Sequence, residues 1–190
     1  MRKPLIGLSV AAMALAPATA WAHPGHDGAG GLISGLEHPL TGMDHLVAML
    51  LVGLWAGLLA PKSRLALSLP AAFLAAMLAG FATSAFVGGG FAEPMILLSL
   101  VVLGAAAAFK LRAPMPLAMG VAALFGFAHG LAHGFETPGG AFPALFAAGF
   151  LASTGVLHAF GLWLARVLPA PAMRALGVAG AGLGLVLAGT

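Results

Sequence analysis

The chain contains no cysteine among its 190 residues, which excludes disulfides, thiolate metal sites and cysteine nucleophiles together. It also carries little charge: Asp, Glu, Lys and Arg make up 7% of the residues, against about one quarter in an average soluble domain. The eight Lys and Arg residues are spread along the chain, so the isoelectric point near 10.2 does not reflect a basic patch for nucleic acid. No Gly-x4-Gly-Lys-Ser/Thr loop is present, which argues against direct use of ATP.

Apolar residues, in contrast, make up 61% of the chain and give a mean hydropathy of +1.06. One small globule cannot bury this much apolar surface, so the composition indicates a membrane as the solvent. Gly and Pro divide the chain into six apolar segments, several of which approach the roughly 20 residues that span a bilayer. We therefore predict an all-α, polytopic membrane protein, a bundle of six transmembrane helices over residues 41–60, 65–87, 94–109, 115–135, 142–165 and 172–189.

The first 22 residues have the pattern of a cleaved secretory signal peptide. Arg2 and Lys3 form a positive start, residues 5–16 are apolar but too short to span a bilayer, and Ala20-Trp21-Ala22 offers a cleavage site. An uncleaved amphipathic anchor is the alternative. The predicted organisation is a signal peptide at 1–22, a periplasmic, histidine-bearing mature amino terminus at 23–40 and a six-helix transmembrane domain at 41–190.

The cations indicate how the segments are oriented. All six Lys and Arg residues after the signal peptide lie between alternate segments: Lys62, Arg64, Lys110, Arg112, Arg166 and Arg174. The positive-inside rule makes these loops cytoplasmic, and a signal peptide independently places the amino terminus outside. We therefore predict a protein of the bacterial inner membrane with a periplasmic mature amino terminus.

The acids and most histidines gather on the opposite, outer side. This group comprises His23, His26, His38, His45, His129, His133, Asp27, Glu37, Asp44, Glu93 and Glu136. Only His158 lies deep, sixteen residues into the fifth segment, or about 24 Å from its outer end at 1.5 Å per residue.

The stretch FGFAHGLAHGFE, residues 125–136, places three ionisable groups at the end of an apolar segment. On a helix, His129, His133 and Glu136 are spaced i, i+4, i+7 and project along one stripe. Two histidines at i, i+4 form a bidentate metal arrangement, and ionisable groups at this depth are costly without a function. A satisfied histidine pair in a helix interface is the alternative. Small residues beside this stripe predict close contact with the first span: Gly126, Gly130 and Gly134.

The stretch EHPLTGMDHLVAM, residues 37–49, is the second candidate. The pair Thr41 and Asp44 resembles a helix-capping box, so the first span would begin directly after Thr41. His38 would precede that helix in an extended turn and fold back toward His45. Stabilisation of the helix end by Asp44 is the alternative, but it explains neither histidine, so we predict that all three residues bind metal.

Four other residues are also candidate metal ligands. Glu93 is equally well explained as a helix-start signal beside a proline. His158 is either a relay beneath the outer site or a core histidine bonded to a neighbouring helix. His23 and His26 would form an exposed metal-collecting tail. Imidazole and carboxylate ligands without thiolates indicate Ni(II), Co(II) or Zn(II), and the ligand types do not select among these ions.

The two motifs together resemble the HupE/UreJ family of membrane nickel permeases. HPLTGMDH matches the His-x5-Asp-His signature of that family, and HGLAHGFE resembles its second motif, Phe-His-Gly-x-x-His-Gly-x-Glu. Here Ala128 precedes His129, and the aromatic residue moves back to Phe127. The resemblance covers nearly the whole chain. It implies that the functional residues are His38, Asp44, His45, His129, His133 and Glu136.

The resemblance further implies a secondary transporter rather than an enzyme, without a catalytic cofactor, that takes up nickel or cobalt for hydrogenase or urease maturation. We predict metal capture at the periplasmic face between the first and fourth spans. The expected partners are a divalent metal ion, the lipid bilayer and an intracellular nickel acceptor protein. Glycines such as Gly180 and Gly184 would also permit a homo-oligomer. An intramembrane zinc-dependent hydrolase and a non-transporting metal-binding or sensing protein are the alternatives.

Overall fold

The computed structural model describes residues 30–189, and the regular elements of this part are all helical. They are α2 (Gly30–Thr41), α3 (Met43–Leu59), the 3-10 turn η2 (Arg64–Leu67), α4 (Ser68–Thr83), α5 (Ala92–Ala108), α6 (Met115–Phe135), α7 (Pro143–Val167) and α8 (Ala170–Ala188). The predicted all-α class is confirmed for these residues. The predicted signal peptide, and His23 and His26, lie outside the described residues.

Within residues 30–189, four helical stretches are long and apolar enough to cross a membrane: Arg64–Thr83, α6, α7 and α8. The helices α2 and α3 meet at an angle of 81° and pass the same test only as a bent pair. Helix α5, over the third predicted segment, is apolar but has 17 residues and is shorter than the four candidate spans. The structure is therefore that of a helical membrane protein with four or five candidate spans.

Helix α2 corrects the prediction for the residues before the first span. His38 and Pro39 lie within α2, not in an extended turn. The helix ends at Thr41, whose hydroxyl donates to the His38 carbonyl at 2.9 Å. Gly42, with extended backbone (φ −90°, ψ 116°), is the N-cap residue of α3 and provides no side-chain cap. The predicted capping box is thus wrong, because Asp44 accepts hydrogen bonds from its neighbour His45 instead.

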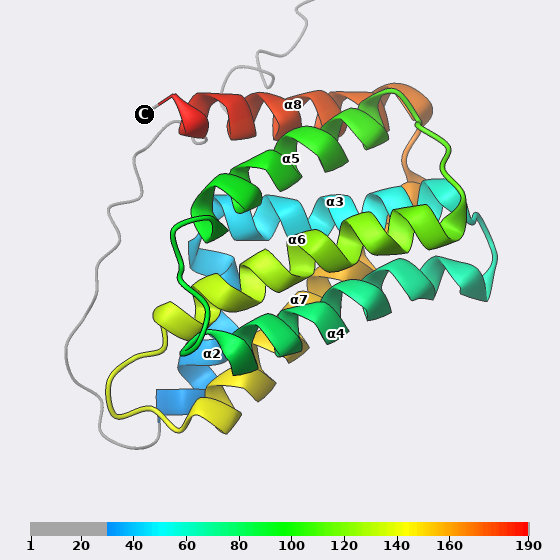
Figure 1. The fold of residues 1–190 in the computed structure, drawn as a ribbon. Helices are drawn as coiled ribbons and strands as arrows, with labels where there is room; N and C mark the ends of the chain where they lie inside the picture. The colour runs from blue at the N-terminus through cyan, green and yellow to red at the C-terminus, as the bar shows by residue number, and fades with distance from the viewer. Residues whose placement is uncertain (1–29, 190) are drawn as a thin grey trace, which may run out of the picture.

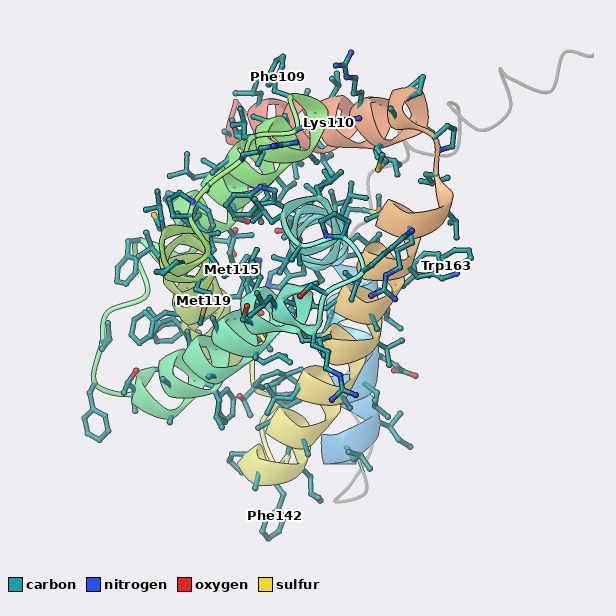
Figure 2. All side chains as sticks on the ribbon, turned by 90° about the vertical axis from the view of Figure 1, so that its right-hand side faces the viewer. Phe109, Lys110, Met115, Met119, Phe142 and Trp163 are labelled. Carbon is teal, nitrogen blue, oxygen red and sulfur yellow. The ribbon has the colours of Figure 1, made fainter. Side chains whose placement is uncertain are left out.

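Helix α3 is the central element of the bundle. Most of its residues between Ala48 and Gly57 are buried. Seen along the bundle, it is surrounded by α4, α6, α7 and the α5–α8 pair (Figure 2). Because α3 has protein on nearly every side, a polar side chain at its start can meet several helices.

The described charges separate to the two ends of the bundle. The three connections after α3, α5 and α7 lie together on the right of Figure 1. The described cations lie in these connections or in the helix turns next to them: Lys62, Arg64, Lys110 (Figure 2), Arg112, Arg166 and Arg174. We call this the cation end. Helix α2 and the connections after α4 and α6 lie at the opposite end, on the left of Figure 1, which we call the histidine end.

Helices α3 and α7 approach each other through glycines that face backbone carbonyls. A Cβ added at Gly53 would meet the carbonyl oxygen of His158, and one added at Gly161 would meet the carbonyl oxygen of Leu50. In each helix the carbonyl comes three residues before the glycine. Small residues in this arrangement allow the two backbones to lie in direct contact.

The same arrangement joins α4 and α6, and it corrects the predicted partner of the glycine stripe. A Cβ at Gly130 would meet the Met77 carbonyl, and one at Gly80 would meet the Phe127 carbonyl. Gly126 and Gly134 also face α4 rather than the first span. Successive residues of a helix point about 100° apart, so α6 directs its glycines toward α4 and the adjacent histidines toward α3.

The glycines of α8 also differ from the prediction. A Cβ at Gly180 would lie 2.7 Å from a methyl group of Leu51, and one at Gly184 would lie 2.8 Å from the Leu97 carbonyl. Both glycines therefore pack against α3 and α5 of the same chain. They do not offer a surface for self-association.

The contact between α4 and α6 predicts different effects for two glycines of the same helix. Gly130→Ala places a methyl group against the Met77 backbone, and overpacking of this kind costs about 1–3 kcal/mol. Gly120→Ala is the matched control, because its Cβ meets nothing within 4 Å. Thermal unfolding of the detergent-purified variants should show a lower midpoint for Gly130→Ala only. Equal midpoints would contradict the close packing of α4 on α6.

Candidate metal site

Three helices bring polar side chains together at the histidine end. His38 comes from α2, His45 from the first turn of α3, and His129 and His133 from the last two turns of α6. Glu136 directly follows α6. Residues separated by about one hundred positions in the sequence therefore meet in one cluster.

The outer part of this cluster is a group of three possible ligands. His38 Nε2 lies 2.8 Å from a carboxylate oxygen of Glu136, and His133 Nδ1 lies 3.9 Å from the same oxygen. One ligand atom from each residue fits within 4.8 Å of the others. The side chains of His38 and Glu136 are 25% and 39% exposed, whereas that of His133 is fully buried. This group therefore connects the surface with the interior.

Behind this group the imidazole rings form a continuous row. The ring centroids are 4.9 Å apart for His38 and His133, 5.0 Å for His133 and His45, and 5.1 Å for His45 and His129. We call these four residues the histidine row. Each ring contacts the next, so the row leads from the partly exposed His38 to the fully buried His129.

In two members of the row, His129 and His45, a hydrogen bond defines the tautomer of the ring and leaves the second ring nitrogen without a partner. His129 Nδ1 donates to the Phe125 carbonyl at 2.8 Å, because a carbonyl can only accept. His45 Nδ1 lies 3.0 Å from a carboxylate oxygen of Asp44 and donates in the same way. When such a ring is neutral its Nε2 carries a lone pair, and both Nε2 atoms are buried without a hydrogen-bond partner. Buried nitrogens in this state are suited to bind a cation.

His133 leaves even more hydrogen-bonding capacity unused. Both of its ring nitrogens are buried without a hydrogen-bond partner. Its ring stacks on Phe150 with centroids 4.6 Å apart. Most buried polar side-chain atoms have a hydrogen-bond partner, so packing alone does not explain this histidine.

Asp44 contacts its neighbour rather than the outer ligand group. Its carboxylate accepts from both the backbone N–H and the ring Nδ1 of His45. A carboxylate in this position fixes the orientation and tautomer of a metal-binding imidazole. The arrangement indicates that Asp44 positions His45.

Aromatic side chains that the sequence analysis missed enclose the row. Phe146 packs edge-on against His38 at 5.4 Å, and Phe150 stacks on His133. Phe73 contacts His129 at 5.2 Å. The spacing of Phe146 and Phe150, four residues apart, could have indicated a shared helix face. No local signal connects Phe73 of α4 with His129.

The remaining predicted residues lie outside this cluster. Glu93 is exposed in the first turn of α5 and lines an apolar groove with α8. It interacts electrostatically with Asp44, His45 and Glu136 but does not belong to the three-ligand group. His158 is buried in α7, and the ring of Phe73 contacts both His158 and His129.

The fold and this cluster define a helical membrane protein with buried histidines at one end. The chain belongs to the HupE/UreJ family, because the family model described as HupE / UreJ protein matches residues 11–189. Protein HupE of Rhizobium leguminosarum bv. viciae is 38% identical over 174 residues, which cover 88% of this chain and 86% of the relative. No solved structure matches the chain significantly.

Family membership confirms the resemblance seen in the two motifs. HupE/UreJ proteins are metal permeases, so membership supports a nickel or cobalt transporter-type role with a metal ion as substrate. The apolar helices fit the membrane location of such a protein.

The contact between Asp44 and His45 can be tested at Gly42. A Cβ at Gly42 would lie 2.9 Å from the Asp44 carboxylate and 3.3 Å from His45 Nδ1, so Gly42→Ala should displace the carboxylate from the ring. We expect Ni(II) affinity to fall by about tenfold, as for the loss of other residues that orient metal ligands. Gly88→Ala, whose Cβ meets nothing within 4 Å, is the control. Calorimetric titration measures both, and equal affinities would contradict a positioning role for Asp44.

Proposed function

We propose that the protein is a secondary transporter that takes up Ni(II), with Co(II) as a second substrate, across the bacterial inner membrane. The metal would supply enzymes such as hydrogenase or urease through an intracellular acceptor protein. The observation that carries this proposal is the histidine row, which leads from a partly exposed carboxylate–imidazole group to buried nitrogens without partners. The nickel or cobalt role of the family supports the choice of ion.

Capture begins at the exposed end of the row. Glu136 and His38 exchange water ligands of the arriving ion for a carboxylate oxygen and an imidazole nitrogen, and His133 adds a ligand from the interior. The carboxylate offsets part of the charge of the dication as it loses water. Nitrogen and oxygen ligands of this kind suit Ni(II) and Co(II).

Movement inward follows from the spacing of the rings. Neighbouring rings of the row lie about 5 Å apart, so an ion can bind the next imidazole before it leaves the previous one. Bare dications are strongly disfavoured in an apolar interior. Continuous coordination along the row therefore lowers the barrier to entry.

The driving force in this proposal is the membrane potential. An inward-negative potential contributes about 2.3 kcal/mol per charge per 100 mV. A dication carries two charges, so this contribution is doubled. For this potential to drive uptake, the histidine end must face the periplasm and the cation end must face the cytoplasm. The gathering of the described Lys and Arg residues at one end supports this orientation.

Single cysteines can test this orientation, because the natural chain has none. Gly139→Cys lies in the connection after α6 at the histidine end, and Leu111→Cys lies in the connection after α5 at the cation end. A membrane-impermeant maleimide added to spheroplasts should label Gly139→Cys and leave Leu111→Cys unmodified until the cells are lysed. The opposite labelling pattern would overturn the proposed orientation.

The proposed function is tested by Ni(II) uptake into proteoliposomes. The wild-type protein should accumulate Ni(II) under an inward-negative potential, measured with a trapped fluorescent chelator. His45→Ala and His133→Ala should each lose most of this uptake, and the double variant should be little worse, because residues that act as a unit are non-additive. Gly120→Ala, remote from the row, should retain full activity.

Other outcomes would assign a different function. Ni(II) binding to the wild-type protein without uptake would indicate a metal-binding or sensing protein. Zinc-dependent hydrolysis without uptake would indicate an enzyme. Folded His133→Ala protein with unchanged uptake would remove the histidine row from the transport path.

A further inference from the structure

One buried histidine beyond the row has no assigned role. His158, in the inner half of α7, is 1% exposed, and both of its ring nitrogens are buried without a hydrogen-bond partner. The predicted core histidine bonded to a neighbouring helix is therefore not what the structure shows. A buried imidazole that forms no hydrogen bond is costly in an apolar interior, which points to a ligand.

The sequence of ring contacts continues from the row to His158. Phe73 lies 5.2 Å from His129 on one side and 5.1 Å from His158 on the other, measured between ring centroids. Its ring is perpendicular to that of His158. A single aromatic ring therefore contacts both the inner end of the row and the next imidazole.

One face of α7 lines the histidine row and continues to His158. Phe146, Phe150, Thr154 and His158 are spaced four residues apart and share a helix face. The first two contact His38 and His133 of the row. The Thr154 hydroxyl, one turn before His158, is also buried without a hydrogen-bond partner. The α7 face that lines the row thus continues inward to the Thr154 hydroxyl oxygen and the two ring nitrogens of His158.

Direct contacts between helices hold the backbone around Phe73 in place. Gly126 of α6 packs directly on the Phe73 carbonyl, and Gly53 of α3 packs directly on the His158 carbonyl. These contacts fix the helix positions at this level. The Phe73 ring contacts both His129 and His158, and the face of an aromatic ring attracts a passing cation.

We propose that His158, with the Thr154 hydroxyl, forms an inner coordination site for the transported dication, and that the Phe73 ring divides it from the histidine row. The proposal rests on the proposed transport function. In this proposal the histidine row captures the ion. His158 then binds the ion as it passes through the middle of the bundle. Loss of His158 should therefore slow transport without weakening capture.

The first test separates uptake from binding. His158→Ala should bind Ni(II) with the wild-type affinity in detergent, while its uptake into proteoliposomes falls by about tenfold or more, the loss typical of damage to a metal site. Gly155→Ala, in the same helix and with open space around its Cβ, is the control and should keep both properties. Rates are compared per folded protein, determined by size-exclusion chromatography.

The second test uses a changed metal preference, which a purely structural histidine would not influence. His158→Cys places the only thiolate of the chain at the inner site. Because thiolates favour softer ions, the ratio of Cd(II) to Ni(II) uptake should rise in His158→Cys. Gly155→Cys should retain the wild-type ratio.

The outcomes distinguish the inner site from the proposed function itself. Absence of uptake by the wild-type protein would overturn the proposed function. If the wild-type protein transports, unchanged uptake in His158→Ala together with an unchanged metal ratio in His158→Cys would overturn the inner site alone. A parallel loss of Ni(II) affinity and uptake in folded His158→Ala would also overturn it, because His158 would then support the outer row.

Discussion

Direct contact between helix backbones at glycines determines where the histidines of residues 30–189 lie. Gly53 on the His158 carbonyl joins α3 to α7, and Gly130 on the Met77 carbonyl joins α4 to α6. A third contact of the same kind, Gly35 on the Phe146 carbonyl, holds α2 to α7. Without these glycines the helices would separate by the thickness of a side chain, and rings that now lie about 5 Å apart would not touch.

The close packing also explains how the bundle can contain unpaired imidazoles. Apolar and aromatic neighbours exclude alternative hydrogen-bond partners, so the Nε2 atoms of His45 and His129 stay available. This state is unfavourable for folding, because buried polar atoms without partners cost stability. Such a cost is expected where a site must be ready for a ligand. The same low-dielectric surroundings that penalise a free nitrogen strengthen its interaction with a cation.

Local spacing was sufficient to predict some of these features and not others. The i, i+4 spacing of His129 and His133 placed both on one helix face, and the structure agrees. The helical state of His38 was not predictable, because the adjacent proline favours a break and only the packing of α2 on α7 overrides it. The helix that packs on Gly130 was not predictable either. A stripe of small residues indicates that another helix packs closely, but it does not identify that helix.

The distribution of buried polar groups gives the bundle a direction. Four imidazoles gather at the histidine end, and His158 follows near the middle of the membrane-crossing helices. Toward the cation end, the buried residues of the described chain are small or apolar, among them Ala56, Ala118 and Ala122. Along the path that we propose for the ion, the number of available ligands therefore decreases. A site rich in ligands favours capture from dilute solution, and a ligand-poor exit avoids a second tight site from which release would be slow.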